Sequence, residues 1–237
     1  MFLLFLFSPL VHSQNLNNKQ RRLSLINLQK TLTGQELLSP FHSFEDAIAH
    51  ITFGDTPSNR LYVLLTEKEE GVEGRLRLNG HLLAASPVYN SWILAMSMVE
   101  HHIYLILKKH GLSHLPYRFP EYSQWSFILA MRHWEELGHP NQYDYAKHPS
   151  APIRKFPLSL QASVTFWDSL WHKDLRSFLK AVKKRHLDLG FDSITLSQYI
   201  FQAPPQKAAA ARELRKAFQD LVFDECQRRT PNQCVRP

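Results

Sequence analysis

Histidine is the residue type in this sequence best suited to chemistry, with 13 copies among 237 residues. His110 and His114 are four residues apart, a spacing that places two imidazoles on one helix face, where they can bind a metal ion. Gly111 is expected to end that helix and separate the rings. Glu136 and His139 have the Glu-x-x-His spacing of di-iron bundle proteins, but that site needs two such pairs and two further glutamates. These four side chains are candidate ligands, and the sequence alone predicts no metal site and no cofactor.

Motifs for catalysis and for nucleotide binding are absent from the sequence. No Gly-x-Ser-x-Gly elbow presents a nucleophilic serine, and neither cysteine has the setting of a catalytic thiol. There is no P-loop, and eight glycines leave little from which to build a phosphate-binding loop. We therefore predict no catalytic residues and favour a non-enzymatic protein. A hydrolase or metalloenzyme that uses the histidine clusters is an alternative.

Aromatic side chains are candidates for protein contacts, because tryptophan is over-represented at interface hot spots. Aromatic residues make up 12% of the chain, and most of them should fill the core of a helical fold. Trp134 differs, because charged residues flank it instead of an apolar run. The candidate binding residues of this class are Trp134, Tyr143, Tyr145 and Trp171.

Positive charge is a second route to a partner. The chain has 28 Lys and Arg against 21 Asp and Glu, which gives a net charge of +7. Lys183, Lys184 and Arg185 stand near the end of a predicted helix, where cations complement the negative helix terminus. Such residues can bind nucleic acid or an anionic surface. Acids such as Glu213 and Asp220 are interleaved with the cations of the last helix, so we favour a solvated face and keep a basic nucleic-acid-associated protein as an alternative.

The two ends of the chain both indicate an oxidising compartment. Residues 1–13 hold an apolar block and then Val11 and Ser13 in a pattern that signal peptidase can cleave, so we predict a signal peptide that ends at Ser13. An N-terminal strand or helix packed in the core is the alternative. The block is too short to span a bilayer, which takes about 20 apolar residues. Cys226 and Cys234 are the only cysteines, and we expect them to form a disulfide.

Hydrophobic periodicity divides the chain into a small β unit and a helical body. An apolar run over 60–66, a turn, and strict alternation over 75–79 predict a hairpin over about 60–79. Ser86 and Pro87 are a favourable helix start, and the apolar stripe after them runs to Gly111. The other expected elements are helices over 43–51, 122–136, 159–189 and 207–225, and a strand or short helix over 193–202.

The expected organisation is one α-rich globular domain over 23–225. A basic polar arm over 14–22 precedes it, a tail over 226–237 follows it, and the aromatic, proline-rich loop over 140–158 is where it would subdivide. The predicted fold class is α+β and predominantly helical, with a small β-hairpin unit followed by about four helices. We predict an exported protein, periplasmic or secreted, that binds other proteins as an accessory or as part of an envelope assembly, with no transmembrane span. A cytoplasmic location is the alternative, and the oligomeric state is left open.

Overall fold

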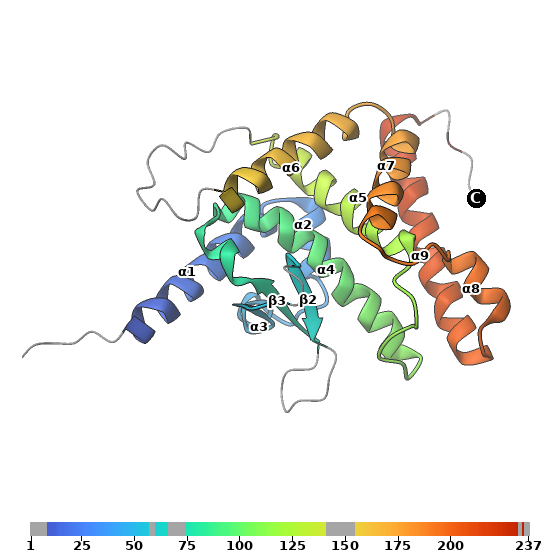
Figure 1. The fold of residues 1–237 in the computed structure, drawn as a ribbon, viewed down its shortest axis with the longest axis horizontal. Coiled ribbons are helices and arrows are strands. Elements are labelled where there is room, and N and C mark those ends of the chain that lie inside the picture. Colours follow the sequence, from blue (N-terminus) through green and yellow to red (C-terminus); the bar gives the residue numbers. More distant parts are fainter. Residues whose placement is uncertain (1–8, 57–59, 66–73, 141–154, 232–233, 235–237) are drawn as a thin grey trace, which may run out of the picture.

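The computed structural model describes residues 9–56, 60–65, 74–140, 155–231 and 234 of the chain. Within them lie nine α-helices, a short 3-10 helix and a three-stranded sheet, which confirms a predominantly helical α+β fold (Figure 1). The N-terminal elements are α1 (Pro9–Gln29), α2 (Leu32–Leu38), α3 (Phe44–Ala49), β1 (Ile51–Gly54), β2 (Tyr62–Leu65), β3 (Arg75–Asn79) and η2 (Gly80–Ala84). The C-terminal elements are α4 (Pro87–Lys109), α5 (Pro120–Glu136), α6 (Lys155–Trp171), α7 (Leu175–Asp188), α8 (Leu196–Gln202) and α9 (Pro205–Arg229).

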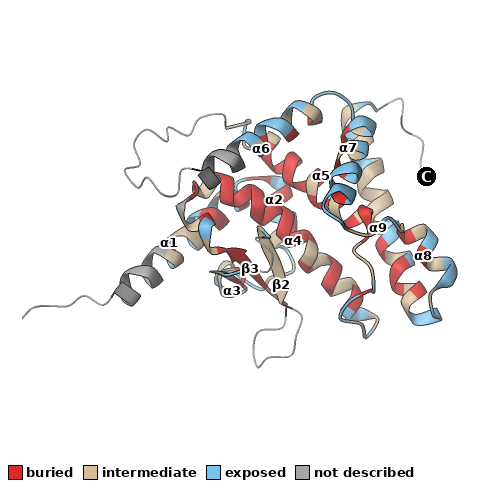
Figure 2. Ribbon diagram, viewed as in Figure 1, coloured by how far each residue is buried: buried red, intermediate tan, exposed pale blue. Residues whose placement is uncertain are grey.

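Helix α4 is the centre of the molecule, and α1 and α5 pack along it (Figure 2). It begins as predicted, with the Ser86 side chain accepting a hydrogen bond from the Val88 amide. The side chains of Trp92, Ile93 and Leu94 are at most 1% exposed. Successive helical residues point about 100° apart, so three buried neighbours in a row mean that this part of α4 is covered on all sides.

The sheet has the strand order β1–β3–β2, with β3 in the middle. Strands β2 and β3 pair antiparallel with Leu64 opposite Leu76, which confirms the predicted hairpin. Strand β1 was not predicted, and it pairs parallel to β3 with Ile51 opposite Leu76. Its four residues are too few to show an alternation of apolar and polar side chains. The strand forms because it pairs with β3, whose residues lie 25 positions later in the chain.

Residues 14–22 are not a separate arm, because α1 runs through them. Arg21 donates a hydrogen bond to the carbonyl oxygen of Ile51 over 2.8 Å, and Arg22 forms an ion pair with Glu45 over 2.7 Å. The segment has no apolar stripe, so periodicity did not reveal its helix. Arg21 and Arg22 instead attach α1 to the elements beside it.

The predicted signal-peptide cleavage point after Ser13 falls inside α1. Leu25 and Leu28, which are fully buried and carry α1 into the core, come after this point. Cleavage there would therefore keep the part of the helix that anchors it.

The predicted helix over 159–189 is two helices, α6 and α7. The Asp174 side chain accepts a hydrogen bond from the Ser177 amide over 2.7 Å, which caps α7 and turns the chain. Trp167 and Phe178 are buried on either side of this corner, so the apolar stripe continues through it and hides the break. Residues 193–202 contain the helix α8, so the described body after the hairpin has six α-helices, more than the four expected.

Helix α9 extends past its predicted end at residue 225 and includes Cys226. Cys226 and Cys234 lie at disulfide distance, with their Cα atoms 5.9 Å apart, as the sequence predicts. Of the predicted loop over 140–158, residues 141–154 lie outside the described residues and Lys155 begins α6. No helix in the described ranges is both long enough and apolar enough to cross a membrane.

Candidate functional site

A groove of about 770 Å³ opens beside strand β2. This volume lies within the range of about 300–1,000 Å³ that is usual for ligand clefts. Its walls come from β2 and the residue before it, β3, α4, the segment that joins α4 to α5, the start of α5, and the residues just after α7. The lining residues are Arg60, Tyr62, Val63, Leu64, Leu65, Arg77, Glu100, Ile103, Tyr104, Leu107, Ser113, His114, Leu115, Pro116, Tyr117, Arg118, Tyr122, Phe191 and Asp192.

Strand β2 is at the edge of the sheet and has β3 on one side only. The Asn79 amide of β3 donates to the carbonyl oxygen of Leu61 over 2.9 Å, so the backbone groups of Leu61 face β3. Because these groups alternate along an antiparallel strand, the N–H and C=O groups of Tyr62 and Leu64 point away from β3. No backbone hydrogen bond to either residue from outside the sheet occurs in the described part of the chain.

Arg118 is a charged residue of the groove wall that contacts several other lining residues. Its guanidinium donates a hydrogen bond to Glu100 over 2.7 Å and lies over the Phe191 ring, 4.7 Å from the ring centroid. Its backbone amide donates to Asp192 over 3.0 Å, which fixes the segment that carries it. The Arg118 Nε is buried and has no hydrogen-bond partner among the described residues. An unpaired buried donor costs about 1–3 kcal/mol, so an acceptor bound at this point would be stabilised.

Two of the four tyrosines that line the groove, Tyr62 and Tyr122, have a raised pKa. Burial, reinforced by the charge of Glu100, raises the pKa of Tyr62 to about 12. Burial also raises the pKa of Tyr122 well above its usual value, and within the described residues its hydroxyl has no hydrogen-bond partner. Both hydroxyls are protonated at neutral pH, so they donate and accept hydrogen bonds but do not act as bases.

The predicted contact residues Trp134 and Trp171 lie in the core instead of on the surface, since each is 2% exposed. Trp134 stacks on Tyr89 with ring centroids 5.4 Å apart. The Trp171 Nε1 donates to Glu135 over 3.2 Å, and the guanidinium of Arg229 lies 3.6 Å from its ring centroid. The charged neighbours of Trp134 in the sequence gave no warning of this burial, because helices from several parts of the fold enclose α5.

The other predicted contact residues are apart from the groove or outside the described residues. Tyr143 and Tyr145 lie outside the described residues. Lys183, Lys184 and Arg185 are exposed on α7, and none of the three lines the groove. Lys184 forms an ion pair with Asp188 of the same helix over 3.2 Å.

The four candidate metal ligands do not converge. The His110 Nε2 lies 2.8 Å from Glu213, whereas His114 lines the groove. Glu136 accepts two hydrogen bonds from Thr33, from the amide over 2.9 Å and from the hydroxyl over 2.6 Å, at the N-terminus of α2. These contacts leave only His139 in a cluster with other potential ligands.

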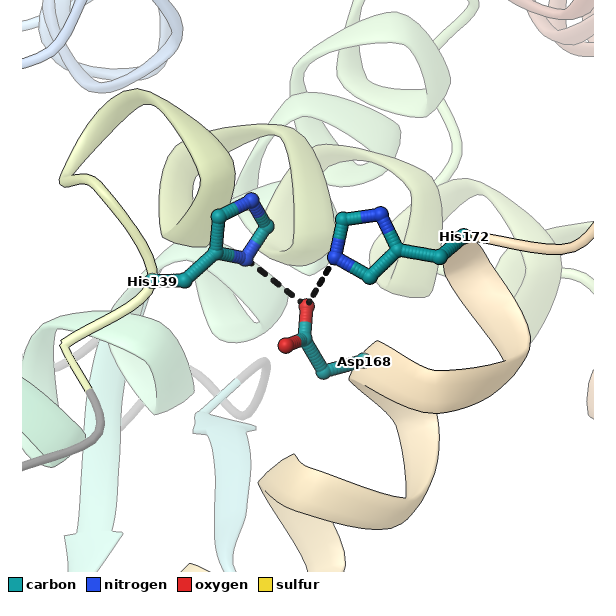
Figure 3. A group of neighbouring side chains, drawn as sticks. All are labelled: His139, Asp168 and His172. Atoms are coloured by element: carbon teal, nitrogen blue, oxygen red, sulfur yellow. Dashed lines mark hydrogen bonds and ion pairs between the residues drawn. The ribbon is translucent and has the colours of Figure 1, made fainter.

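His139 lies beside Asp168 and His172, which sequence reasoning missed (Figure 3). Asp168 and His172 have the same i, i+4 spacing as His110 and His114, so this signal was present in the sequence. The sequence predicted one continuous helix over 159–189, and such a helix has no turn at His172. The cluster forms because the turn after α6 and the turn after α5 bring the three side chains together.

Comparison of the chain with protein-family models, curated proteins and solved structures finds no match.

Proposed function

We propose that this protein is an exported, non-catalytic protein that binds an extended segment of a partner protein along the free edge of β2. The observation that carries the proposal is that the outward backbone groups of Tyr62 and Leu64 belong to a strand that lines the groove. An extended peptide can add to such an edge through main-chain hydrogen bonds, while the groove receives alternate side chains. Strand β2 has four residues at about 3.3 Å each, so a partner segment of about four residues would cover it.

The charges of the groove favour an acidic partner segment. Arg60, Arg77 and Arg118 line it. Glu100 and Asp192 offset two of these three cations, which leaves the wall positive. The net charge of +7 on the whole chain adds attraction for an anionic segment. We therefore expect a partner strand in which acidic residues alternate with apolar ones, with a carboxylate near the free Nε of Arg118.

Selection from a library of random octapeptides on the immobilised protein tests this proposal. Peptides with Asp or Glu at alternate positions should be enriched. Their binding should weaken at least about tenfold, or 1.4 kcal/mol, in Leu64→Pro, because proline removes an outward N–H and obstructs the edge. Fluorescence anisotropy of a labelled selected peptide measures the change.

Leu64→Ala is the matched control, since it shortens the same side chain and keeps the N–H, so its loss should be smaller. The Leu64 amide makes no bond to β3, and the proline variant should therefore keep the hairpin, which circular dichroism checks. If that variant does not fold, the selected peptide with alternate N-methylated amides provides the same test on the unmodified protein. Absence of acidic enrichment, or equal binding after either change, would rule out recognition at the strand edge.

Export is supported by the leader over 1–13 and by the cysteine pair. We expect protein from its own host to begin at Gln14 and to have Cys226 and Cys234 oxidised. Intact-mass measurement with and without alkylation reads out both features. A chain that begins at Met1 with two alkylated cysteines would contradict export.

A further inference from the structure

We propose that His139, Asp168 and His172 form a binding site for a divalent transition-metal ion with the ligand preference of zinc. The site is independent of the β2 groove and of the peptide-binding function proposed for it. His139 comes from the turn after α5, whereas Asp168 and His172 stand four residues apart at the end of α6 (Figure 3).

The positions of the three ligand atoms match those around one ion. The His139 Nδ1 lies 2.9 Å and the His172 Nε2 lies 3.6 Å from the same Asp168 Oδ1. All three ligand atoms lie within 4.8 Å of one another. Ligand atoms bound to zinc at about 2.0–2.1 Å in a tetrahedron are separated by roughly 3.4 Å, so only small side-chain movements would complete the site.

The backbone turns after α5 and α6 bring the three side chains together. Helix α5 ends at Glu136 and is followed by Gly138 and His139, both with positive φ, at 79° and 50°. This left-handed turn is common for glycine and uncommon for other residues, although histidine is among the types that adopt it more often. The His139 amide donates to the carbonyl oxygen of Trp134 over 3.1 Å, which holds the turn against the end of α5. On the other side, α6 ends at Trp171, and His172 is the first residue of the corner that leads to Asp174.

The chemistry of the donor set favours zinc over the hard cations. Two imidazole nitrogens and one carboxylate oxygen suit zinc and its late transition-metal neighbours, whereas magnesium and calcium prefer oxygen ligands alone. The side chains of His172, His139 and Asp168 are 56%, 25% and 16% exposed, so an ion can enter from solvent. Three protein ligands leave one tetrahedral position for water.

Calorimetric titration of zinc into the untagged full chain, after treatment with a chelator, tests the site. We expect one zinc ion per chain at this cluster, with binding at least about tenfold weaker in Asp168→Asn and in His172→Ala. Cobalt(II) added to the chain should give visible absorption bands that both substitutions abolish.

His42→Ala is the matched control, because it removes an exposed histidine that is not part of the cluster, and it should leave the affinity unchanged. The three variants are expected to fold, since His42 and His172 are exposed and Asn has the shape of Asp. If the protein binds no zinc, Asp168 only forms ion pairs with the two imidazoles. If zinc binding survives both Asp168→Asn and His172→Ala, the ion lies elsewhere. Either result would overturn the proposal.

Discussion

Replacing Glu225 by glutamine is expected to lower the free energy of unfolding by about 3 kcal/mol. The Glu225 side chain is fully buried and accepts hydrogen bonds from three arginines. The distances are 3.0 Å from Arg132 Nε, 2.8 Å from Arg228 Nη2 and 2.6 Å from Arg229 Nε. Burial would raise the pKa of Glu225, but the bonds from Arg228 and Arg229 outweigh it and hold this pKa below its usual range. Glutamine keeps the volume and removes the charge that balances three cations.

Asp224→Asn is the matched control for this prediction. It makes the same change of charge on the neighbouring residue of α9, which is exposed, and should alter the free energy of unfolding by less than about 0.5 kcal/mol. Urea denaturation of both variants and of the unmodified protein measures the difference. Equal effects of the two substitutions would show that the buried network contributes no more than a surface charge.

Acidification from pH 6.5 to pH 4.5 is expected to destabilise the protein through its buried histidines. The His133 ring is fully buried, with one nitrogen 2.7 Å from the Thr31 hydroxyl oxygen and the other 2.9 Å from that of Ser91. Burial lowers the pKa of His133 to about 3. Burial likewise lowers the pKa of His101 to about 4, against an opposing hydrogen bond with the carbonyl oxygen of Gly74.

The direction of the effect follows from proton binding. Both histidines have a pKa near 6.5 in the unfolded chain, so between this value and their folded values the unfolded state binds more protons. Their stabilisation is therefore complete above pH 6.5 and decreases as the pH falls, at up to about 1.4 kcal/mol per pH unit for each residue. Carboxylates with a lowered pKa, such as Glu225, reduce stability only as the pH falls below about 4.5. Between pH 6.5 and 4.5 the slope therefore comes from the histidines with a lowered pKa, which also include His102 and His186. Glu121, whose pKa is raised by burial, opposes it in this window.

Urea denaturation at several pH values within this window measures how the free energy of unfolding changes with pH. His133→Asn should reduce the slope of the free energy of unfolding against pH by the contribution of one residue. If the asparagine variant does not fold, the slope of the unmodified protein still tests the prediction. A free energy of unfolding that is constant from pH 6.5 to 4.5 would contradict it.

The sequence was sufficient for features that rest on neighbours in the chain. Alternating apolar and polar residues over 75–79 predicted strand β3 of the hairpin. The helix start at Ser86 and Pro87, together with the long apolar stripe that follows, predicted α4. Cys226 and Cys234 are eight positions apart, and this proximity made their pairing predictable. These elements form where local spacing and capping alone select one conformation.

Tertiary structure decided the features that depend on contacts between distant segments. The burial of Trp134 results from helices that pack around α5, and the hydrogen bond from Arg21 to β1 reaches across 30 positions. The groove joins an edge strand to the segment after α4, and the cluster joins His139 to a carboxylate 29 residues away. The sequence by itself therefore determined the helical class, the hairpin and the cysteine pair. Only packing decided which side chains meet, because periodicity records the burial of a face and not the partner that buries it.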